Sequence, residues 1–561
     1  MSTISASTTS TTAYKVTADT TGTLVLQTGS TPTTAVTIGT DQVVTFAKPP
    51  AATGAGGVST NTAYGTNALS NASTTGTYNI GVGPSTGVAL TSGTDNIGVG
   101  GFALTATDSG SENIGVGVSS LRANTTGSNN IGIGTQALRN NTTASNNTAV
   151  GYQAGYSNTT GPYFTAIGYK AGYSNLTGDQ NTFVGYLAGT LTTGASNTAL
   201  GAFCLDVNVG GANNVALGTA SLHSNTSGSY NTAVGRDSLR SNTTASHNTA
   251  VGYQAGYSTT VGGNSYIGYQ AGYSNTTGGL NIFLGYQAGY YIATTSYNMA
   301  LGVGALQGAA GTNTSAENIA IGWHAGYAVT SGGFNTLIGN ETGKSLTTGS
   351  TNVAIGAYCF SANTTGSQNV SVGQASLNAN TNGSGNTALG YVAGGTLTTG
   401  NYNTYIGYGS TASGTGVTQE LVVGTYNTTG KGSTTAFING GGGNTYNGAN
   451  ASTWATTSDR RLKKNIADFN SGLEKIIAIR VRNFEYRLPE EIEELSANDA
   501  IAKQGVQLGV IAQELQEVLP DCVYQESTGV LSVQTDNLTW YLVNAIKQLK
   551  AEFDAYKEAH P

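Results

Sequence analysis

The side chains that most often carry out chemistry are few in this sequence and lie far apart. Cleavage of a polysaccharide needs two neighbouring carboxylates, but the acids between residues 51 and 440 stand singly, as at Asp95, Glu112, Asp179, Asp237 and Glu317. The three cysteines are distant and odd in number, unlike a disulfide framework or a metal site: Cys204, Cys359 and Cys522. The four histidines do not cluster either: His223, His247, His324 and His560. The sequence therefore predicts no metal, no cofactor and no polysaccharide-cleaving centre.

Charge is concentrated at the C-terminal end. The last 104 residues hold 12 Lys or Arg and 17 Asp or Glu, against 9 and 11 in the preceding 457. So abrupt a change of composition indicates a domain boundary at Ser458. The boundary reads Ser458-Asp459-Arg460-Arg461-Leu462-Lys463-Lys464-Asn465-Ile466. A serine five residues before a lysine carries no information by itself, so its meaning depends on the surrounding motifs.

Three motifs in order give this domain its resemblance to a known family. The boundary sequence matches every fixed position of that family's opening pattern, which is Ser-Asp-x-Arg-x-Lys-x-x-Ile. Farther along, Gly509-Val510-Ile511-Ala512-Gln513-Glu514-Leu515 precedes Leu519-Pro520, and the end contains Asn544-Ala545-Ile546-Lys547-Gln548-Leu549-Lys550. Over about 104 residues the domain resembles the S74 family, the intramolecular chaperones of endosialidases and other phage tail proteins.

The resemblance implies a single self-cleavage. It makes Ser458 the nucleophile and Lys463 the general base, with the cut between Thr457 and Ser458 releasing residues 458–561. A lysine deprotonates a serine only if burial or a cationic neighbour lowers its pKa toward neutrality, and Arg461 and Lys464 are near in sequence. The implied activity is one turnover of serine autoproteolysis, with no external substrate.

The last residues predict a helix with an apolar stripe. Its members follow at spacings of 4, 4, 3, 4 and 3: Leu538, Leu542, Ile546, Leu549, Phe553 and Tyr556. This pattern is typical of a coiled-coil seam, through which three chains could align their repeats in register. The alternative is that the stripe packs on its own domain.

A long repeat precedes this domain. An anchor glycine follows an aliphatic residue every 17 residues from Gly83 to Gly424, with two spacings of 16 and one of 20 around residues 308–314; a first copy lies at Asn61 to Gly65. A typical unit is Asn147-Thr148-Ala149-Val150-Gly151 followed by a polar turn. Such a period predicts a solenoid in which each coil packs on its neighbours. About 22 coils spaced ~4.8 Å apart would make a rod on the order of 100 Å long.

Each position of the repeat suggests a role. The residue before the anchor is always Val, Ile or Leu, so we expect it to form the inward core row. Asparagine recurs four residues before the anchor and could bond to its counterparts along the stack or close its own turn; Phe164 and Glu420 are departures. Glycines supply the corners that require positive φ.

Tyrosines recur at two further positions of the repeat. They lie one residue after the anchor (Tyr152, Tyr169, Tyr186, Tyr253, Tyr269 and Tyr286) and five residues after it (Tyr156, Tyr173, Tyr257, Tyr273 and Tyr290). Packing between chains is the favoured interpretation, and a ladder of aromatic faces for sugar rings is the alternative. The irregular 20-residue unit near Gly308 is a second candidate receptor site.

The fold expected is mainly β: a trimeric parallel β-roll or solenoid shaft with a C-terminal α+β chaperone domain ending in a coiled-coil helix. A 17-residue coil encloses a thin core, and trimerisation would bury one face of every coil. Repeats such as Asn-Thr-Ala-Val-Gly are similar to the head repeats of trimeric autotransporter adhesins, which form β-rolls in a trimer. Separate rolls and interwoven chains both stay open.

Four domains are expected: 1–50, 51–440, 441–457 and 458–561. The first contains four short strands, Tyr14–Ala18, Gly22–Gln27, Thr34–Ile38 and Gln42–Phe46, and either attaches the fibre to the particle or caps the first coil. The second is the shaft, and the third is a polar linker.

Function follows as a hypothesis from this organisation. The leading interpretation is a phage tail fibre or spike that binds a host receptor, with a glycan as one candidate, and other tail or baseplate proteins through its N-terminus. It would be made in the host cytoplasm and act on the virion tail.

The net charge of −7 argues against binding to nucleic acid, and the sequence contains no window of 18 apolar residues that would predict membrane insertion. The alternatives are a trimeric bacterial adhesin, for which we find no signal peptide or anchor in the sequence, and a fibre of a phage-like injection particle.

Overall fold

The protein is described here by a computed structural model. The structure describes residues 60–71, 75–309, 314–439, 460–492, 503–525 and 530–561, together with the backbone of six short strands outside these ranges, β1 to β4, β28 and β29. Two compact units result, Met1–Thr457 and Ser458–Pro561. Each is described by itself.

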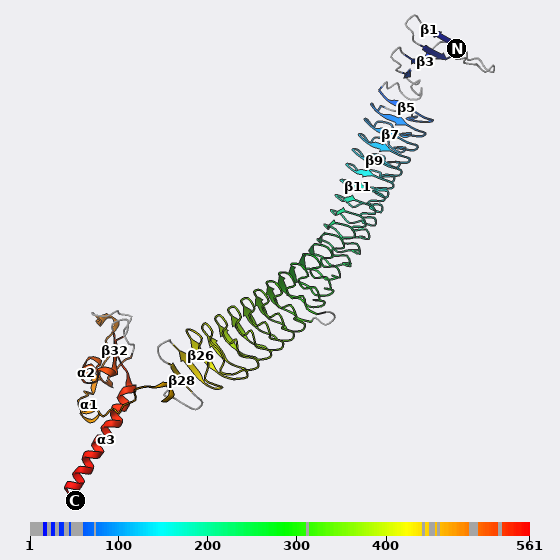
Figure 1. Ribbon diagram of the computed structural model, residues 1–561. Helices are drawn as coiled ribbons and strands as arrows, with labels where there is room; N and C mark the ends of the chain where they lie inside the picture. The colour runs from blue at the N-terminus through cyan, green and yellow to red at the C-terminus, as the bar shows by residue number, and fades with distance from the viewer. Residues whose placement is uncertain are drawn as a thin grey trace. The chain divides into compact units, whose positions relative to one another are not determined.

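The shaft is a stack of coils that each contribute one short strand to a continuous parallel ladder (Figure 1). Neighbours along the chain pair in register throughout, as Thr232 does with Thr249. The strands are β5 (Thr62–Tyr64), β6 (Ile80–Val82), β7 (Ile97–Val99), β8 (Ile114–Val116), β9 (Ile131–Ile133), β10 (Thr148–Val150), β11 (Thr165–Ile167), β12 (Thr182–Val184), β13 (Thr198–Leu200), β14 (Val215–Leu217), β15 (Thr232–Val234), β16 (Thr249–Val251), β17 (Ser265–Ile267), β18 (Ile282–Leu284), β19 (Met299–Leu301), β20 (Ile319–Ile321), β21 (Thr336–Ile338), β22 (Val353–Ile355), β23 (Val370–Val372), β24 (Thr387–Leu389), β25 (Thr404–Ile406), β26 (Leu421–Gly424) and β27 (Ala436–Asn439). The 17-residue parallel solenoid predicted from the sequence is confirmed, including its first copy at β5.

The core row is not the one expected. In every strand from β6 to β27 the middle residue is buried, and the residues before and after it face outward. The aliphatic residue before each anchor glycine therefore lies on the outer face, and that expectation was wrong. Side chains alternate along a strand, and the buried Asn two residues earlier in the coil places the middle residue on the inner side. The outward aliphatic row is Val82, Val99, Val116, Ile133, Val150, Ile167, Val184, Leu200, Leu217, Val234, Val251, Ile267, Leu284, Leu301, Ile321, Ile338, Ile355, Val372, Leu389, Ile406, Val423 and Ile438.

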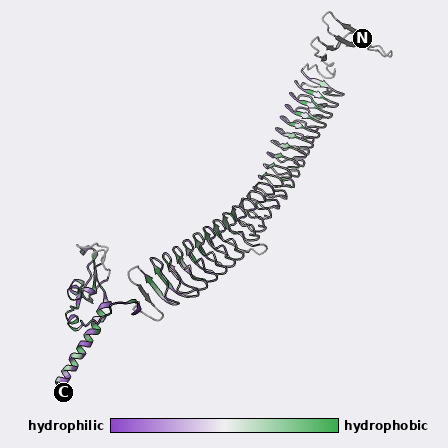
Figure 2. Cartoon of the chain, in the orientation of Figure 1, coloured by the Kyte–Doolittle hydropathy of each residue, from purple (hydrophilic) through white to green (hydrophobic). Residues whose placement is uncertain are grey.

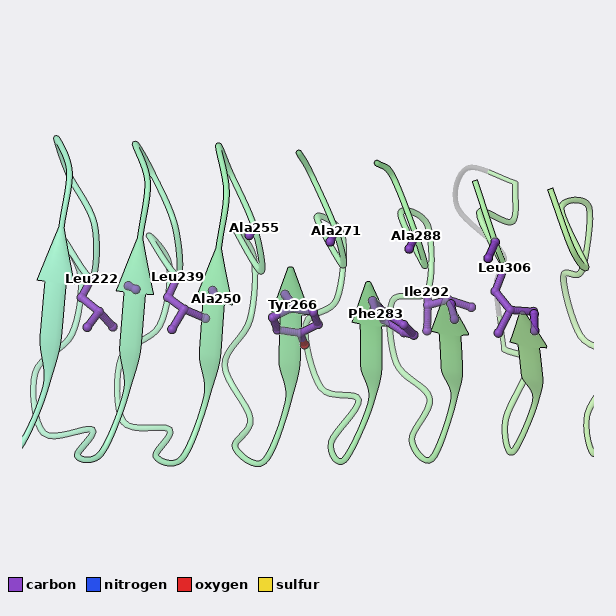
Figure 3. Close-up of a cluster of buried hydrophobic side chains, with 14 of the residues drawn as sticks. Leu222, Leu239, Ala250, Ala255, Tyr266, Ala271, Phe283, Ala288, Ile292 and Leu306 are labelled. Carbon is purple, nitrogen blue, oxygen red and sulfur yellow. The ribbon is translucent and has the colours of Figure 1, made fainter. Parts of the chain in front are cut away.

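The core of the coil is filled from two positions, that of the middle strand residue and that of the residue six places later, and a large side chain at either position goes with a small one at the other. Where the middle strand residue is Ala216, Leu222 fills the space across the coil; where it is Tyr266, the matching residue is Gly272. A Cβ on Gly272 would lie 2.3 Å from the Tyr266 ring. Figure 3 shows Leu222, Leu239, Tyr266, Phe283 and Leu306 following one another inside neighbouring coils. Large and small side chains thus alternate so that each thin coil is filled.

Asparagines form a buried ladder along the shaft, as the sequence predicted. Asn231 Oδ1 accepts the backbone N–H of Asn248 at 3.0 Å, and Asn231 Nδ2 donates to the Ala245 carbonyl at 2.8 Å. Phe164 replaces one rung, and its N–H still donates to Asn147 Oδ1 at 2.8 Å. The ladder satisfies backbone groups that a corner would otherwise leave unpaired.

The tyrosine rows stack within one chain. Tyr152 on Tyr169 and Tyr169 on Tyr186 have ring centroids 5.5 and 5.2 Å apart and interplanar angles of 14° and 12°. The second row behaves alike, with Tyr156 on Tyr173 at 5.0 Å. Neighbouring rings therefore stack on one another along the shaft, while Tyr152, Tyr169 and Tyr186 stay 41–49% exposed. Packing along a single chain is the contact observed, and packing between chains and a ladder of faces for sugar rings both stay predictions.

The anchor glycines meet the conformational requirement expected of a corner. Gly235 has φ of 123°, and a Cβ there would lie 2.5 Å from the Gly252 carbonyl oxygen. The sequence did not reveal that other residues also adopt positive φ in each coil, among them Tyr163 at 56° and His247 at 63°. The stack of hydrogen-bonded neighbours holds these residues in a conformation that L side chains rarely adopt.

Short sheets lie outside the regular coils. The four expected N-terminal strands are present as an antiparallel sheet of β1 (Lys15–Ala18), β2 (Leu24–Thr28), β3 (Thr33–Ile38) and β4 (Val44–Phe46). Beyond the last coil, β28 (Asn444–Asn447) pairs antiparallel with β27, and β29 (Ala455–Thr456) pairs with β28. The segment expected to be a linker thus contains two strands.

Candidate functional site

The C-terminal unit has a small core. Its elements are η1 (Arg460–Leu462), α1 (Leu473–Ile477), β30 (Arg482–Phe484), η2 (Pro489–Glu491), β31 (Gln507–Gly509), α2 (Ala512–Val518), η4 (Pro520–Cys522), β32 (Val523–Gln525), β33 (Leu531–Val533) and α3 (Thr535–Ala559). Four buried side chains form the core: Leu515, Leu519, Cys522 and Tyr541. Many apolar side chains remain outside it, and Leu462, Ile477 and Leu508 are each more than 70% exposed.

The second motif of this unit builds its centre. Gly509 ends β31, and α2 places Leu515 in the core, with Leu519 just beyond its end. Glu514 accepts two hydrogen bonds from the Arg482 guanidinium, Nη2 to Oε1 at 2.8 Å and Nε to Oε2 at 3.1 Å. These bonds lower the pKa of the Glu514 carboxyl. The motif therefore joins β30 to α2.

Helix α3 holds the segment that follows the boundary motif. Asn544 Nδ2 donates to the Phe469 carbonyl at 2.6 Å, and Gln548 Nε2 donates to the Asn470 carbonyl at 2.6 Å. Gln548 Oε1 also accepts the N–H of Leu473 at 2.6 Å. A Cβ on Gly472 would lie 2.3 Å from the Ala545 nitrogen, so only glycine fits between loop and helix. The terminal motif thus positions residues 469–473, a role that sequence reasoning missed because the contacts span more than 70 residues.

The structure describes only part of the predicted catalytic pair. Thr457 and Ser458 lie outside the described residues. Lys463 directly follows η1, its backbone N–H donates to the Arg460 carbonyl at 3.1 Å, and its side chain is exposed. Arg461 and Lys464 are exposed as well. A single chain therefore does not bury Lys463, as a general-base lysine requires.

The predicted seam of α3 is divided between two faces. Leu538, with Tyr541 and Ala545, packs on the unit's own core. The other five seam residues are exposed by 43–66%: Leu542, Ile546, Leu549, Phe553 and Tyr556. Apolar and polar residues alternate along this helix in Figure 2. The exposed five keep the 4-3-4-3 spacing of a coiled-coil seam.

The remaining sequence-selected residues stand apart in the shaft. Cys204 and Cys359 are buried free thiols, and burial raises the pKa of Cys204 to about 12. His223 Nδ1 lies 2.9 Å from Asp206 Oδ1. Glu420 replaces an asparagine of the ladder, and its buried carboxylate accepts the Gly432 N–H at 2.8 Å. Among the described residues no three His, Cys, Asp or Glu side chains gather as metal ligands, and no described helix is long and apolar enough to cross a membrane.

Comparison with known proteins gives one result. Residues 458–524 match the family model described as peptidase S74, chaperone of endosialidase. Neither the curated proteins nor the solved structures yielded a match. The matched residues begin at the start of the C-terminal unit and end before α3. The chain thus joins a long β-solenoid shaft to a C-terminal segment that matches the autoproteolytic intramolecular chaperones of the S74 family.

Proposed function

We propose that this chain is the subunit of a trimeric tail fibre or tail spike of a bacterial virus, matured by one self-cleavage. The observation that carries the proposal is the S74 match starting at residue 458, C-terminal to a long repeat shaft. A shaft of near-identical coils can slip by one repeat at little energetic cost. A chaperone at its C-terminal end would set the register of three chains, and would then be dispensable.

The cleavage would follow ordinary acyl-transfer chemistry. Lys463 takes the proton of Ser458 as Oγ attacks the carbonyl carbon of Thr457. The Thr457–Ser458 C–N bond breaks, the Ser458 amine takes a proton, and Thr457 becomes an ester on Oγ. Water then hydrolyses that ester to the Thr457 carboxylate and the free hydroxyl.

The exposure of Lys463 in the single chain makes assembly part of this proposal. A general-base lysine needs burial or a cationic neighbour, so contacts with another chain would enclose the Lys463 side chain in the active form. Five exposed seam residues on α3 supply a surface for such contacts. Cleavage would therefore follow trimerisation, which protects unassembled chains from losing their chaperone.

A denaturing gel with intact mass tests the cleavage. Protein expressed from Met1 should yield a product ending at Thr457 and a fragment starting at Ser458. Ser458→Ala and Lys463→Ala should stay full length, whereas Lys464→Ala, its exposed neighbour, should be cut. Full-length wild type would refute self-cleavage, and a cut Lys463→Ala variant would refute the assigned base.

Native mass tests the trimer in a Ser458→Ala background, where α3 stays attached. Ile546→Glu with Phe553→Glu should dissociate the chaperone units, because both side chains belong to the exposed seam. Lys547→Glu, on another face of the same helix, serves as the control. A monomeric Ser458→Ala parent would contradict the trimer.

The remaining parts of the proposal concern the particle. The N-terminal sheet would attach to other tail or baseplate proteins, and the shaft would present the receptor-binding surface, with a surface glycan as one ligand class. Purified mature shaft should compete with virus for adsorption to host cells. Full adsorption in the presence of excess shaft would remove the receptor-binding role.

A further inference from the structure

The outer face of the shaft's ladder carries an unbroken row of aliphatic residues along its whole length. We define the strand-face stripe as the first and third residues of each three-residue strand from β6 to β25, with the matching residues of β26 and β27. The third residue is Val, Ile or Leu in every one of these strands, and the first is aliphatic, Met, Ala, Thr or Ser. Neither position carries a charge anywhere in the stripe. In Figure 2 the strands of the shaft are coloured toward the hydrophobic end.

These side chains are open in the single chain. The most exposed members range from 36% for Val353 to 50% for Leu200. About 22 coils at ~4.8 Å and a strand width of about 10 Å give a stripe on the order of 1,000 Å². The largest apolar patch of a typical monomer covers only ~300–600 Å². The third strand position faces outward and is aliphatic in every coil, where a solvated face would place polar residues; this row is therefore expected to be covered by a partner.

The shape of the stripe identifies its partner. The stripe repeats once per coil and runs from the first regular coil to the last, so a partner must offer an apolar row of equal period and length. The other face of each strand is already buried in the coil, which leaves the stripe of a second copy as the surface that matches. An interface of about 800 Å² per partner is standard for stable complexes, and the stripe exceeds that.

We infer that the strand-face stripe is the lengthwise interface between copies of this chain, packed face inward around a common axis parallel to the shaft. Each chain has one such stripe. If the chains close around a common axis, every stripe is buried, whereas an open assembly would leave a stripe exposed at its end. The inference rests on the proposed trimer and adds which surface forms it. It also assigns a role to the outward aliphatic row, which the core of the single coil does not use.

Three substitutions on alternate strands test the inference. Ile133→Glu, Ile167→Glu and Leu200→Glu place charges on the stripe of β9, β11 and β13, where the monomer exposes these side chains by 39–50%. The matched control is Thr126→Glu, Thr160→Glu and Ser227→Glu, at exposed turn positions outside the stripe. Native mass and circular dichroism are measured on the mature shaft after cleavage.

We expect the control shaft to keep the mass of the wild-type trimer. The stripe variant should have the mass of a monomer and should keep the circular dichroism spectrum of a β protein. If the stripe variant fails to fold, the same three positions are changed to Thr, which many coils carry at the first strand position, and trimer dissociation on dilution should rise at least tenfold. A stripe variant as trimeric as the control overturns the inference while leaving the trimer intact. A monomeric wild-type shaft and uncut chain together would instead refute the proposed function.

Discussion

At the scale of single residues, Glu514 and Arg482 fasten two elements of the C-terminal unit. Their two hydrogen bonds lower the pKa of the Glu514 carboxyl below its value in the unfolded chain. Such a group stabilises the fold above the unfolded pKa of about 4.3, and the effect is lost as pH falls through the lower folded pKa.

Glu514→Gln should therefore lower the unfolding temperature of the C-terminal unit at neutral pH. The difference from the parent should shrink toward zero in acid, where the parent carboxylate is also neutral. Thermal unfolding of the Ser458→Ala chain at several pH values measures this. Glu517→Gln on the same helix is the control, and an equal loss at every pH would contradict the assigned ion pair.

The buried thiols give a second prediction at this scale. Burial raises the pKa of Cys204 to about 12 and also raises the pKa of Cys359 and Cys522. The thiolate is the reactive form, so all three should resist an aromatic disulfide reagent in the native protein and react once it is denatured. Ser227→Cys, at an exposed turn, should react at once. Rapid titration of a native thiol would show that the coil around it opens.

At the scale of the element, each coil keeps its core full by exchanging volume between two positions. Tyr266 occupies the space that Leu222 and Leu239 fill in other coils, and Gly256 and Gly272 make room for its ring. Because the flanking glycines carry no side chain that could collapse into the space, a lost ring leaves a cavity.

Tyr266→Ala should accordingly destabilise the surrounding coils by ~3–5 kcal/mol. Hydrogen exchange should show the loss of protection centred on β16 to β18. Tyr163→Asn, which changes a tyrosine that is 61% exposed and keeps a residue tolerant of positive φ, should have little effect. Equal effects of both changes would mean that the core of the coil does not limit its stability.

At the scale of the whole molecule, the shaft is a chain of nearest-neighbour contacts. Each strand from β6 to β26 pairs with the strand before it and the strand after it. Stability of such an array is approximately a sum over coils and their interfaces, so its length can change without changing its fold.

Deleting residues 215–231, one full 17-residue period, joins Asn214 to Thr232 and restores the pattern of the repeat. This variant should fold, cleave and assemble as wild type does, with a shaft shorter by about 4.8 Å. Deleting residues 215–223 should break the stack at this point, because the eight residues left of that period are too few to form a coil and bring the next strand into register. Mass, circular dichroism and electron microscopy distinguish the two, and a folded nine-residue deletion would contradict in-register stacking.

The sequence alone determined the features that depend on neighbouring residues or on a repeated period. A fixed 17-residue spacing can only be satisfied by stacking like on like, so the parallel solenoid and its asparagine ladder followed from it. The charge difference at Ser458 and three ordered motifs likewise predicted the separate C-terminal unit and its match to the S74 family model.

Tertiary structure alone decided which side of each strand faces inward. In a three-residue strand the local pattern of Thr148-Ala149-Val150 favours the larger aliphatic residue for the core, but closure of the coil turns Ala149 inward and Val150 outward. The fit of Gly472 against α3 and the exposure of Lys463 likewise depend on segments distant in the chain. Burial is a property of the closed coil and the packed unit, and no short stretch of sequence contains it.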